Sequence, residues 1–202
     1  GTEEWLKARL GVPSASNFSK VVTTKGLRST SFMGYVNALI AEKLTGDPTY
    51  VKITEPMERG TSLEDEARAM YQLINDTEVR QVDFIKHPNM EVGCSPDGLI
   101  DVKCDRGLLG GLEIKCPLQG THVEYLRAGK VPSKYMLQVQ GCMFVTGRGY
   151  WDFMSYHPKM KPLIVRTYRD DDLINELATN LQEAVLLIED GVDKFNWNGL
   201  FS

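Results

Sequence analysis

Two short runs of β-forming residues near the middle of the chain most strongly limit its fold. Residues 92–104 and 111–116 are both rich in such side chains, and the Asp-Arg-Gly sequence at 105–107 between them is typical of a turn. Together they predict an antiparallel β-hairpin. Chains with a central hairpin and helices on either side fold around a sheet, which excludes an all-helical bundle or a coiled coil.

The hairpin places three charged residues near one another. With the turn at 105–107, antiparallel pairing puts Asp97 roughly opposite Lys115 and Cys116. Glu113 and Lys115 are two residues apart on one strand, so their side chains project from the same face. We therefore expect Asp97, Glu113 and Lys115 to converge.

Helical and strand patterns surround the hairpin. Apolar residues recur at helical spacing in five segments, and three further segments are rich in β-formers. The expected helices run from a Ser14 cap to Val22, from a Thr30 or Ser31 cap to the residue before Gly46, onward from Thr61 after a turn at Gly60, and over residues 135–145 and 171–189; residues 79–85, 150–156 and 163–168 are the further β-rich segments. This order predicts an α/β or α+β fold with a central mixed β-sheet flanked by helices.

Length and composition agree with a single packed domain over residues 1–202. The chain has a mass of 22.7 kDa, and 42% of its residues are hydrophobic. No window holds eighteen uninterrupted apolar residues, and the N-terminal segment is charged, so we expect a protein that is not exported and has no contact with a membrane. Its four cysteines form no Cys-x-x-Cys pair, which predicts reduced, buried thiols rather than a zinc site.

The net charge of −4 does not exclude a nucleic-acid partner. Residues 170–193 contain eight acidic residues and no Lys or Arg, so the rest of the chain is net positive. Residues 1–43 carry six basic and three acidic residues. This N-terminal part could face phosphate, although an ordinary mixed surface explains the same charges equally well.

Asp97 followed by Glu113-x-Lys115 has the form of the PD-(D/E)XK nuclease motif. Phosphodiester hydrolysis uses carboxylates that hold divalent ions and a cation beside the nucleophile, and these residues supply both. A rival triplet, Asp101-x-Lys103, lies closer to the turn without a third carboxylate, so we interpret it as hairpin surface. Spacing alone leaves a second interpretation of the Asp97 set open, namely a turn followed by a surface Glu–Lys pair.

Beyond the triplet, five ordered segments resemble the lambda-exonuclease-like phage recombination nucleases, a branch of the PD-(D/E)XK superfamily. The segments are WLKARLG (5–11) with SAS (14–16), GTSLEDEA (60–67), CSPDGL (94–99), GLEIKCP (111–117) and YMLQVQ (135–140). The resemblance covers most of the chain. It implies a restriction-endonuclease-like α/β core.

The resemblance also implies roles for individual residues at the centre of the site. Asp97, Glu113 and the backbone carbonyl of Ile114 would be metal ligands, and Lys115 would contact the nucleophilic water or the scissile phosphate. Glu64 and Gln138 match the two remaining active-site positions of the family. From the residues alone, we would favour a solvated helix-surface Glu for Glu64 and a buried structural amide for Gln138.

Three further residues match a pocket that holds a terminal 5′-phosphate in the family: Arg9, Ser16 and Ser95. Ser16 lies in the first turn of a predicted helix, where free N–H groups favour an anion, and an arginine can bind phosphate with two hydrogen bonds. A surface salt bridge for Arg9 and a helix cap for Ser16 remain alternatives.

One family position does not match. An acidic residue is expected ten positions before the motif aspartate, and that position holds His87. Asp83 or Glu91 takes this place if the loop is shifted. The identity of the residue that completes a second metal site therefore stays open.

The resemblance implies a Mg²⁺-dependent 5′-to-3′ exonuclease, with Mn²⁺ as an alternative metal and two ions in each site. Such an enzyme degrades one strand of double-stranded DNA from its ends to mononucleotides and leaves 3′ overhangs for recombination by strand annealing. The resemblance also implies a homotrimer and a single-strand annealing protein as partner. It further implies a phage or prophage gene whose product acts in the cytoplasm of a bacterial host. The alternatives are an endonuclease or junction resolvase on the same core, and a catalytically inactive DNA-end-binding protein.

Overall fold

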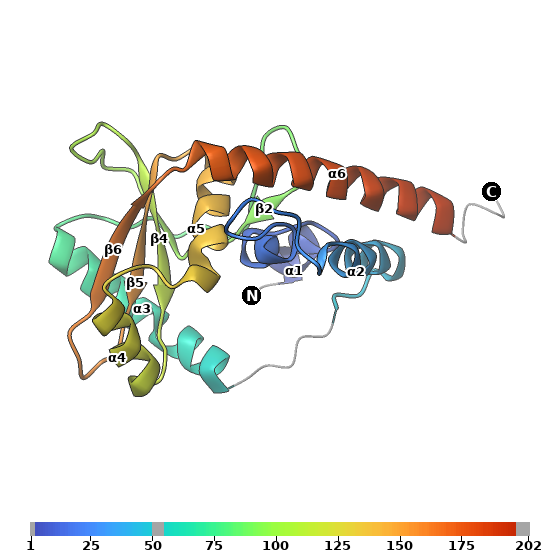
Figure 1. Cartoon of the computed structure of the whole chain (residues 1–202). Coiled ribbons are helices and arrows are strands. Elements are labelled where there is room, and N and C mark those ends of the chain that lie inside the picture. The colour runs from blue at the N-terminus through green and yellow to red at the C-terminus, as the bar shows by residue number, and fades with distance from the viewer. Residues whose placement is uncertain (1–2, 50–54, 197–202) are drawn as a thin grey trace.

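A four-stranded mixed sheet organises the chain in the computed structural model, which describes residues 3–49 and 55–196 (Figure 1). The described residues also form a separate two-stranded pair and six α-helices. In chain order the elements are α1 (Glu3–Arg9), the 3₁₀ helix η1 (Ala15–Lys20), α2 (Phe32–Thr45), α3 (Glu55–Asn75), β1 (Ile85–Lys86), β2 (Gly93–Cys94), β3 (Gly98–Ile100), β4 (Gly110–Lys115), α4 (Gln119–Ala128), α5 (Ser133–Thr146), β5 (Tyr150–Ser155), β6 (Leu163–Tyr168) and α6 (Asp171–Phe195).

The strands of the main sheet lie in the order β3-β4-β5-β6. β3 pairs with β4, and β5 with β6, in antiparallel fashion, whereas β4 and β5 are parallel over all six residues of each. The parallel step requires a crossover, and α4 and α5 supply it. β1 and β2 form their own antiparallel pair.

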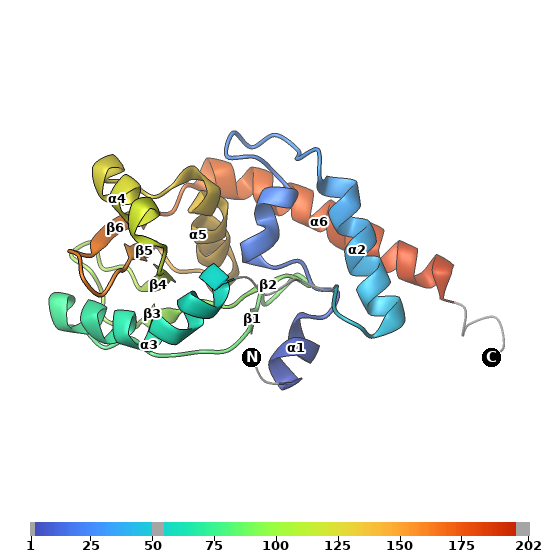
Figure 2. The same ribbon diagram turned by 90° about the horizontal axis from the view of Figure 1, so that it is seen from below.

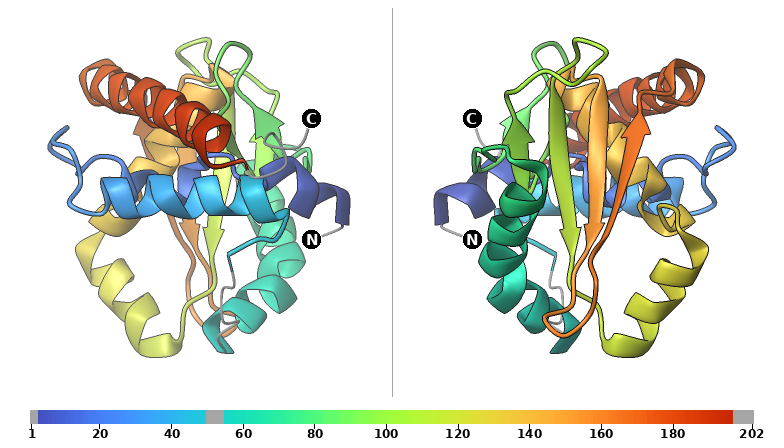
Figure 3. Two further views of the ribbon diagram at one scale, coloured as in Figure 1. Left: turned by 90° about the vertical axis from the view of Figure 1, so that its right-hand side faces the viewer. Right: turned by 90° about the vertical axis from the view of Figure 1, so that its left-hand side faces the viewer.

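The two faces of the main sheet pack against different helices. α3 covers one face and α5 the other, as the two end-on views show (Figure 3). The α3 face buries Ala67, Tyr71, Ile100, Leu112, Ile114 and Met154, and the α5 face buries Leu99, Leu137, Val139, Trp151 and Phe153. Because side chains alternate along β4, Glu113 and Lys115 project to the α5 face.

The N-terminal segments extend the α5 layer. α2 and α6 run side by side (Figure 2). η1 packs on α5 where Gly141 admits the Phe18 ring, since a Cβ on Gly141 would lie 2.3 Å from that side chain. Ser14 forms a parallel bridge with Gly93, which brings the segment before η1 beside β2.

Most of the predicted elements are confirmed, with corrections at their ends. The third helix begins at Glu55 rather than at Thr61, because Gly60 weakens a helix without ending it. Ser14 precedes a short 3₁₀ helix that ends at Lys20, and its side chain makes no capping hydrogen bond. Only Ile85 of the segment 79–85 lies in a strand. The final helix continues to Phe195.

The predicted hairpin register is wrong by two residues in the strands. Around the turn, the Cys104 N–H donates to the Leu108 carbonyl, as a turn at 105–107 requires. The strands instead pair Gly98 with Leu112, so by extension Asp97 lies opposite Glu113 rather than Lys115. The loop between the strands absorbs this shift.

Two further expectations concern cysteines and membranes. The four cysteines are free thiols; Cys94, Cys116 and Cys142 are buried, whereas Cys104 is only partly buried. Over residues 3–49 and 55–196, no helix has the length and apolar character needed to cross a membrane.

Candidate active site

Glu113 is the most deeply buried member of the site. It lies on β4, and its side chain is only 1% exposed. Its Oε1 accepts a hydrogen bond from Gln138 Nε2 on α5 at 2.6 Å and forms an ion pair with Lys115 Nζ. Its Oε2 is buried and has no hydrogen-bond partner in the described part of the chain. The side chain is therefore oriented by two donors and keeps one free acceptor.

Asp97 joins the site from the turn between β2 and β3. Its Oδ2 accepts a hydrogen bond from the Ile114 backbone N–H at 2.5 Å, and its backbone carbonyl accepts one from Arg68 Nε at 3.0 Å. Both contacts fix the turn against its neighbours, one against β4 and one against α3. The predicted convergence of Asp97 with Glu113 and Lys115 is thus present despite the shifted register.

Glu64 approaches the same centre from α3. Its Oε1 accepts from the Arg68 guanidinium at 2.5 Å, and Arg68 also donates to Asp65 at 2.7 Å. The Glu64 side chain is 38% exposed, whereas that of Arg68 is 8% exposed. Arg68 therefore ties the Glu64 helix to the backbone of Asp97.

Several negative charges share this small volume, and their pKa values reflect it. Burial and the nearby charge of Asp97 together raise the pKa of Glu113 to about 7, against the opposing attraction of Lys115. Burial likewise raises the pKa of Asp97 and of Glu64. For Lys115 the burial cost is outweighed by Glu113 and Asp97, so its pKa lies above the usual value. The centre is short of positive charge.

The oxygen atoms of this site are suitable ligands for a hard divalent cation. Carboxylate and carbonyl oxygens are the ligands that Mg²⁺ and Mn²⁺ prefer, and the unpaired, buried Glu113 Oε2 is an acceptor that a cation would satisfy. In residues 3–49 and 55–196, no three His, Cys, Asp or Glu side chains converge closely enough to hold a metal by themselves. The expected set has only two carboxylates from the hairpin, Asp97 and Glu113, and it adds the Ile114 carbonyl. Glu64 is turned toward Arg68.

An aromatic layer on α5 adjoins Lys115. The Lys115 ammonium lies 5.3 Å from the centre of the Tyr135 ring, and Lys134 lies 4.9 Å from the same ring. Tyr135 stacks on Phe153 of β5 with a centroid distance of 5.4 Å. Lys115 is therefore held between its carboxylate partner and an aromatic face.

Arg9 and Ser95, from the predicted phosphate pocket, lie near a common neighbour. The Arg9 guanidinium stacks over the Trp5 ring at 4.2 Å, and Trp5 Nε1 donates to Ser95 Oγ at 3.0 Å. Burial lowers the pKa of Arg9. Since an arginine titrates far above neutral pH, Arg9 stays charged.

Ser16, the third predicted member of the phosphate pocket, lies in the first turn of η1 and is linked to the other two through Ser14. Its hydroxyl is 3.4 Å from that of Ser14, whose backbone N–H donates to the Tyr35 hydroxyl at 3.2 Å. The parallel bridge from Ser14 to Gly93 places this turn beside the strand that leads to Ser95. The three predicted residues thus come from segments that lie next to each other.

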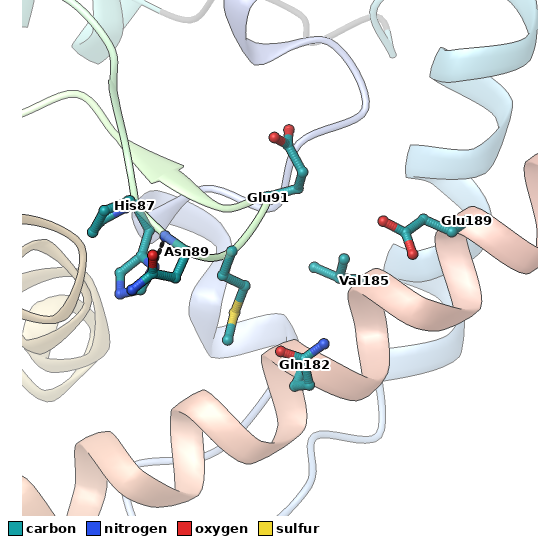
Figure 4. Close-up of a pocket in the computed structure, with 8 residues that line it drawn as sticks. His87, Asn89, Glu91, Gln182, Val185 and Glu189 are labelled. Atoms are coloured by element: carbon teal, nitrogen blue, oxygen red, sulfur yellow. Dashed lines mark hydrogen bonds between the residues drawn. The ribbon is translucent and has the colours of Figure 1, made fainter.

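The candidates for a second metal site are separated. His87 and Glu91 lie at the turn of the β1–β2 pair and line a surface cavity of about 270 Å³ together with Gln182 and Glu189 of α6 (Figure 4). His87 also stacks on Phe144 at 4.6 Å. Asp83 precedes β1 at the opposite end from that turn, and so at the end nearer Ser95.

The rival triplet lies on the surface, as predicted. Asp101 is 48% exposed and is held by Arg80 at 2.7 Å and Arg148 at 2.5 Å. These hydrogen bonds lower the pKa of Asp101 to about 2. Asp101 therefore belongs to a surface ion-pair network away from Glu113.

The sequence profile of the YqaJ-like viral recombinase domain matches residues 4–149 of the chain. The chain belongs to this family. It is 35% identical to an alkaline exonuclease, LHK-Exo, from Laribacter hongkongensis; the match covers 98% of both chains with a TM-score of 0.85. The same relative has been solved in complex with dAMP. No curated protein is significantly similar to the chain.

A more distant structure supports the fold alone. A phage-related exonuclease from Haemophilus somnus is 14% identical, and the match covers 91% of this chain and 96% of that chain with a TM-score of 0.68. Together with LHK-Exo it confirms the predicted α/β fold, a mixed sheet flanked by helices. The resemblance to lambda-exonuclease-like recombination nucleases is confirmed as well.

Sequence reasoning did not find Arg68 or the aromatic neighbours of Lys115. Arg68 follows Glu64 by four residues, which is the helical spacing of an ion pair, and this spacing was the available signal. Nothing local to Tyr135 indicates its contact with a strand twenty residues earlier. Such contacts follow from packing α5 onto the sheet.

Proposed function

We propose that the chain is a metal-dependent 5′-to-3′ exonuclease that hydrolyses one strand of double-stranded DNA to mononucleotides. The observation that carries the proposal is the convergence of Asp97, Glu113 and Lys115, with one buried Glu113 oxygen left free. The similarity to an alkaline exonuclease, which has also been solved with a bound mononucleotide, supports it.

Asp97, Glu113 and the Ile114 carbonyl would hold Mg²⁺, with Glu64 contributing to a second ion, and Mn²⁺ could replace both. Bound metal supplies a lowered pKa for water and charge neutralisation at the phosphate. Lys115 places a positive charge beside the reacting phosphate, where negative charge grows in the transition state. Gln138 holds the Glu113 carboxylate in one orientation through its 2.6 Å hydrogen bond.

The N-terminal residues would set the direction. Arg9, Ser16 and Ser95 would bind the terminal 5′-phosphate, since a guanidinium and hydroxyls are suited to a dianion. Contacts with phosphates rather than base edges make the activity independent of sequence. The remaining strand is a 3′ overhang, the substrate for a single-strand annealing partner. A homotrimer in the bacterial cytoplasm belongs to the same proposal.

A single assay tests the proposal. Linear duplexes labelled at the 5′ or the 3′ end, and a covalently closed circular duplex, are incubated with Mg²⁺ and with EDTA. We expect mononucleotides released first from the 5′ label, only from linear DNA and only with metal. Cutting of the closed circle would favour an endonuclease, and binding of ends without release under any metal would favour an inactive DNA-end-binding protein.

A further inference from the structure

Three cationic side chains, Lys115 on β4 and Arg68 and Arg59 on α3, differ in what they bind. Lys115 is paired with Glu113, and Arg68 is held by Glu64, Asp65 and the Asp97 carbonyl. Arg59, on the first part of α3, has a buried Nε with no hydrogen-bond partner, and the structure gives its guanidinium no ion pair among the described residues. Buried donors are nearly always satisfied, so this exception calls for an acceptor from outside the chain.

The position of Arg59 is set by its helix. Arg59, Leu63 and Glu66 are spaced i, i+4 and i+7 and therefore lie on one side of α3. Glu66 accepts a 2.5 Å hydrogen bond from the Tyr156 hydroxyl, and the Tyr156 N–H donates to the Lys115 carbonyl. This side of α3 thus faces the ends of β4 and β5, directly after Lys115.

The charge of Arg59 acts on two side chains just after β4 and β5. Arg59 lies close enough to the Cys116 thiol for its charge to act on it. Burial lowers the pKa of His157, and Arg59 lowers it further. Cys116 is the residue after Lys115, and His157 opens a loop that carries Lys159 and Lys161 and no acidic residue. An anion next to Lys115 would meet positive charge from both elements.

We propose that the Arg59 guanidinium binds a backbone phosphate of the DNA strand, adjacent to the phosphate that is hydrolysed. The inference rests on the proposed nuclease function and adds a substrate contact to it. A guanidinium with unused N–H groups binds a phosphate through one or two charge-assisted hydrogen bonds. Arg59 contacts neither Asp97 nor Glu113, so it acts on the substrate and not on the metal.

The test compares Arg59→Gln and Arg59→Lys with the full-length parent, and Arg80→Gln is the matched control. Arg80 is an exposed arginine whose partner is the surface residue Asp101. DNA affinity is measured with Ca²⁺ in place of Mg²⁺ between about 50 and 300 mM NaCl. We expect Arg59→Gln to weaken binding about tenfold and to reduce the slope of log affinity against log salt by about one. Arg59→Lys should keep the slope, and Arg80→Gln should match the parent.

Kinetics and a modified substrate sharpen the test. We expect Arg59→Gln to raise KM about tenfold while kcat and the Mg²⁺ concentration for half-maximal rate change less than about threefold. Replacing one backbone phosphate of the DNA by a neutral methylphosphonate should weaken DNA binding by the parent but not by Arg59→Gln. Unchanged affinity and slope in Arg59→Gln, or loss of folding in both variants, would overturn the inference. A parent that neither binds nor degrades DNA would instead overturn the proposed function.

Discussion

The carboxylate centre (Glu64, Asp97, Glu113, Lys115 and Gln138) and the N-terminal cluster (Arg9, Ser16 and Ser95) are built in different ways. Most of the centre comes from one hairpin, where backbone pairing places Asp97 opposite Glu113 and a hydrogen bond from Ile114 fixes the aspartate. The N-terminal cluster comes from three segments joined by side-chain contacts and one bridge. A site built on paired strands is more rigid than one built on segment ends.

This contrast predicts that changes in the centre act on chemistry and metal, and that changes in the N-terminal cluster act on the choice of DNA end. The largest effect is expected for Lys115→Ala. It removes the cation beside the reacting phosphate but no metal ligand, so the rate of nucleotide release should fall at least about 10³-fold while DNA-end affinity changes little. Single-turnover rates and fluorescence anisotropy measure the two quantities. Near-parental release would refute the role of Lys115.

The next effect separates two aspartates of the same hairpin. Asp97→Ala should weaken Mg²⁺ or Mn²⁺ binding at least about tenfold in a calorimetric titration, because it removes a carboxylate from the centre. Asp101→Ala breaks only the ion pairs with exposed Arg80 and largely buried Arg148, which lie away from the centre, so metal affinity should change less than about twofold. If Asp101→Ala were the more damaging change, the metal would lie elsewhere on the hairpin.

The same contrast explains how much the sequence could predict. Local periodicity was enough for the hairpin, for the approach of Asp97 to Glu113 and Lys115, and for most helices. It failed for the strand register, because the nine residues between β3 and β4 shift the pairing, and for the helix start at Glu55. Arg68, Tyr135 and Arg59 act across elements, so only packing reveals them. The N-terminal cluster was predictable only from the family resemblance.

A smaller effect concerns stability and pH in the centre. The pKa of Glu113, about 7, lies above its value in an unfolded chain, so the folded state holds a proton that the unfolded state releases. The resulting stabilisation is present at low pH and is lost as pH rises through 7. In EDTA we expect the free energy of unfolding to fall by about 1–3 kcal/mol between pH 5 and 8. Urea denaturation at each pH measures it.

Two controls test the source of this pH dependence. Glu113→Gln should remove most of it, and Mg²⁺ should stabilise the parent more at pH 8 than at pH 5, because the ion replaces the proton on the carboxylates. The low pKa of Asp101, about 2, makes stability fall as pH decreases, but this contribution changes only at pH values below the two compared. Equal stability at pH 5 and 8 in EDTA would show that folding does not raise the pKa of Glu113.

The smallest effect tests the N-terminal cluster. Duplexes with a 5′-phosphate should be degraded about tenfold faster than those with a 5′-hydroxyl, since a charge-assisted hydrogen bond that exists only with the phosphate contributes about 1.5–3 kcal/mol. Arg9→Ala should reduce this preference to less than about threefold without changing metal affinity, because Arg9 stacks on Trp5 and touches no carboxylate of the centre. Lys7→Ala is the matched control, since Lys7 is exposed on the same helix and pairs with Glu3. Initial rates on both end chemistries measure the preference. Equal rates in the parent would remove the end-binding role and, with it, the main reason to prefer a 5′ exonuclease over an endonuclease on this core.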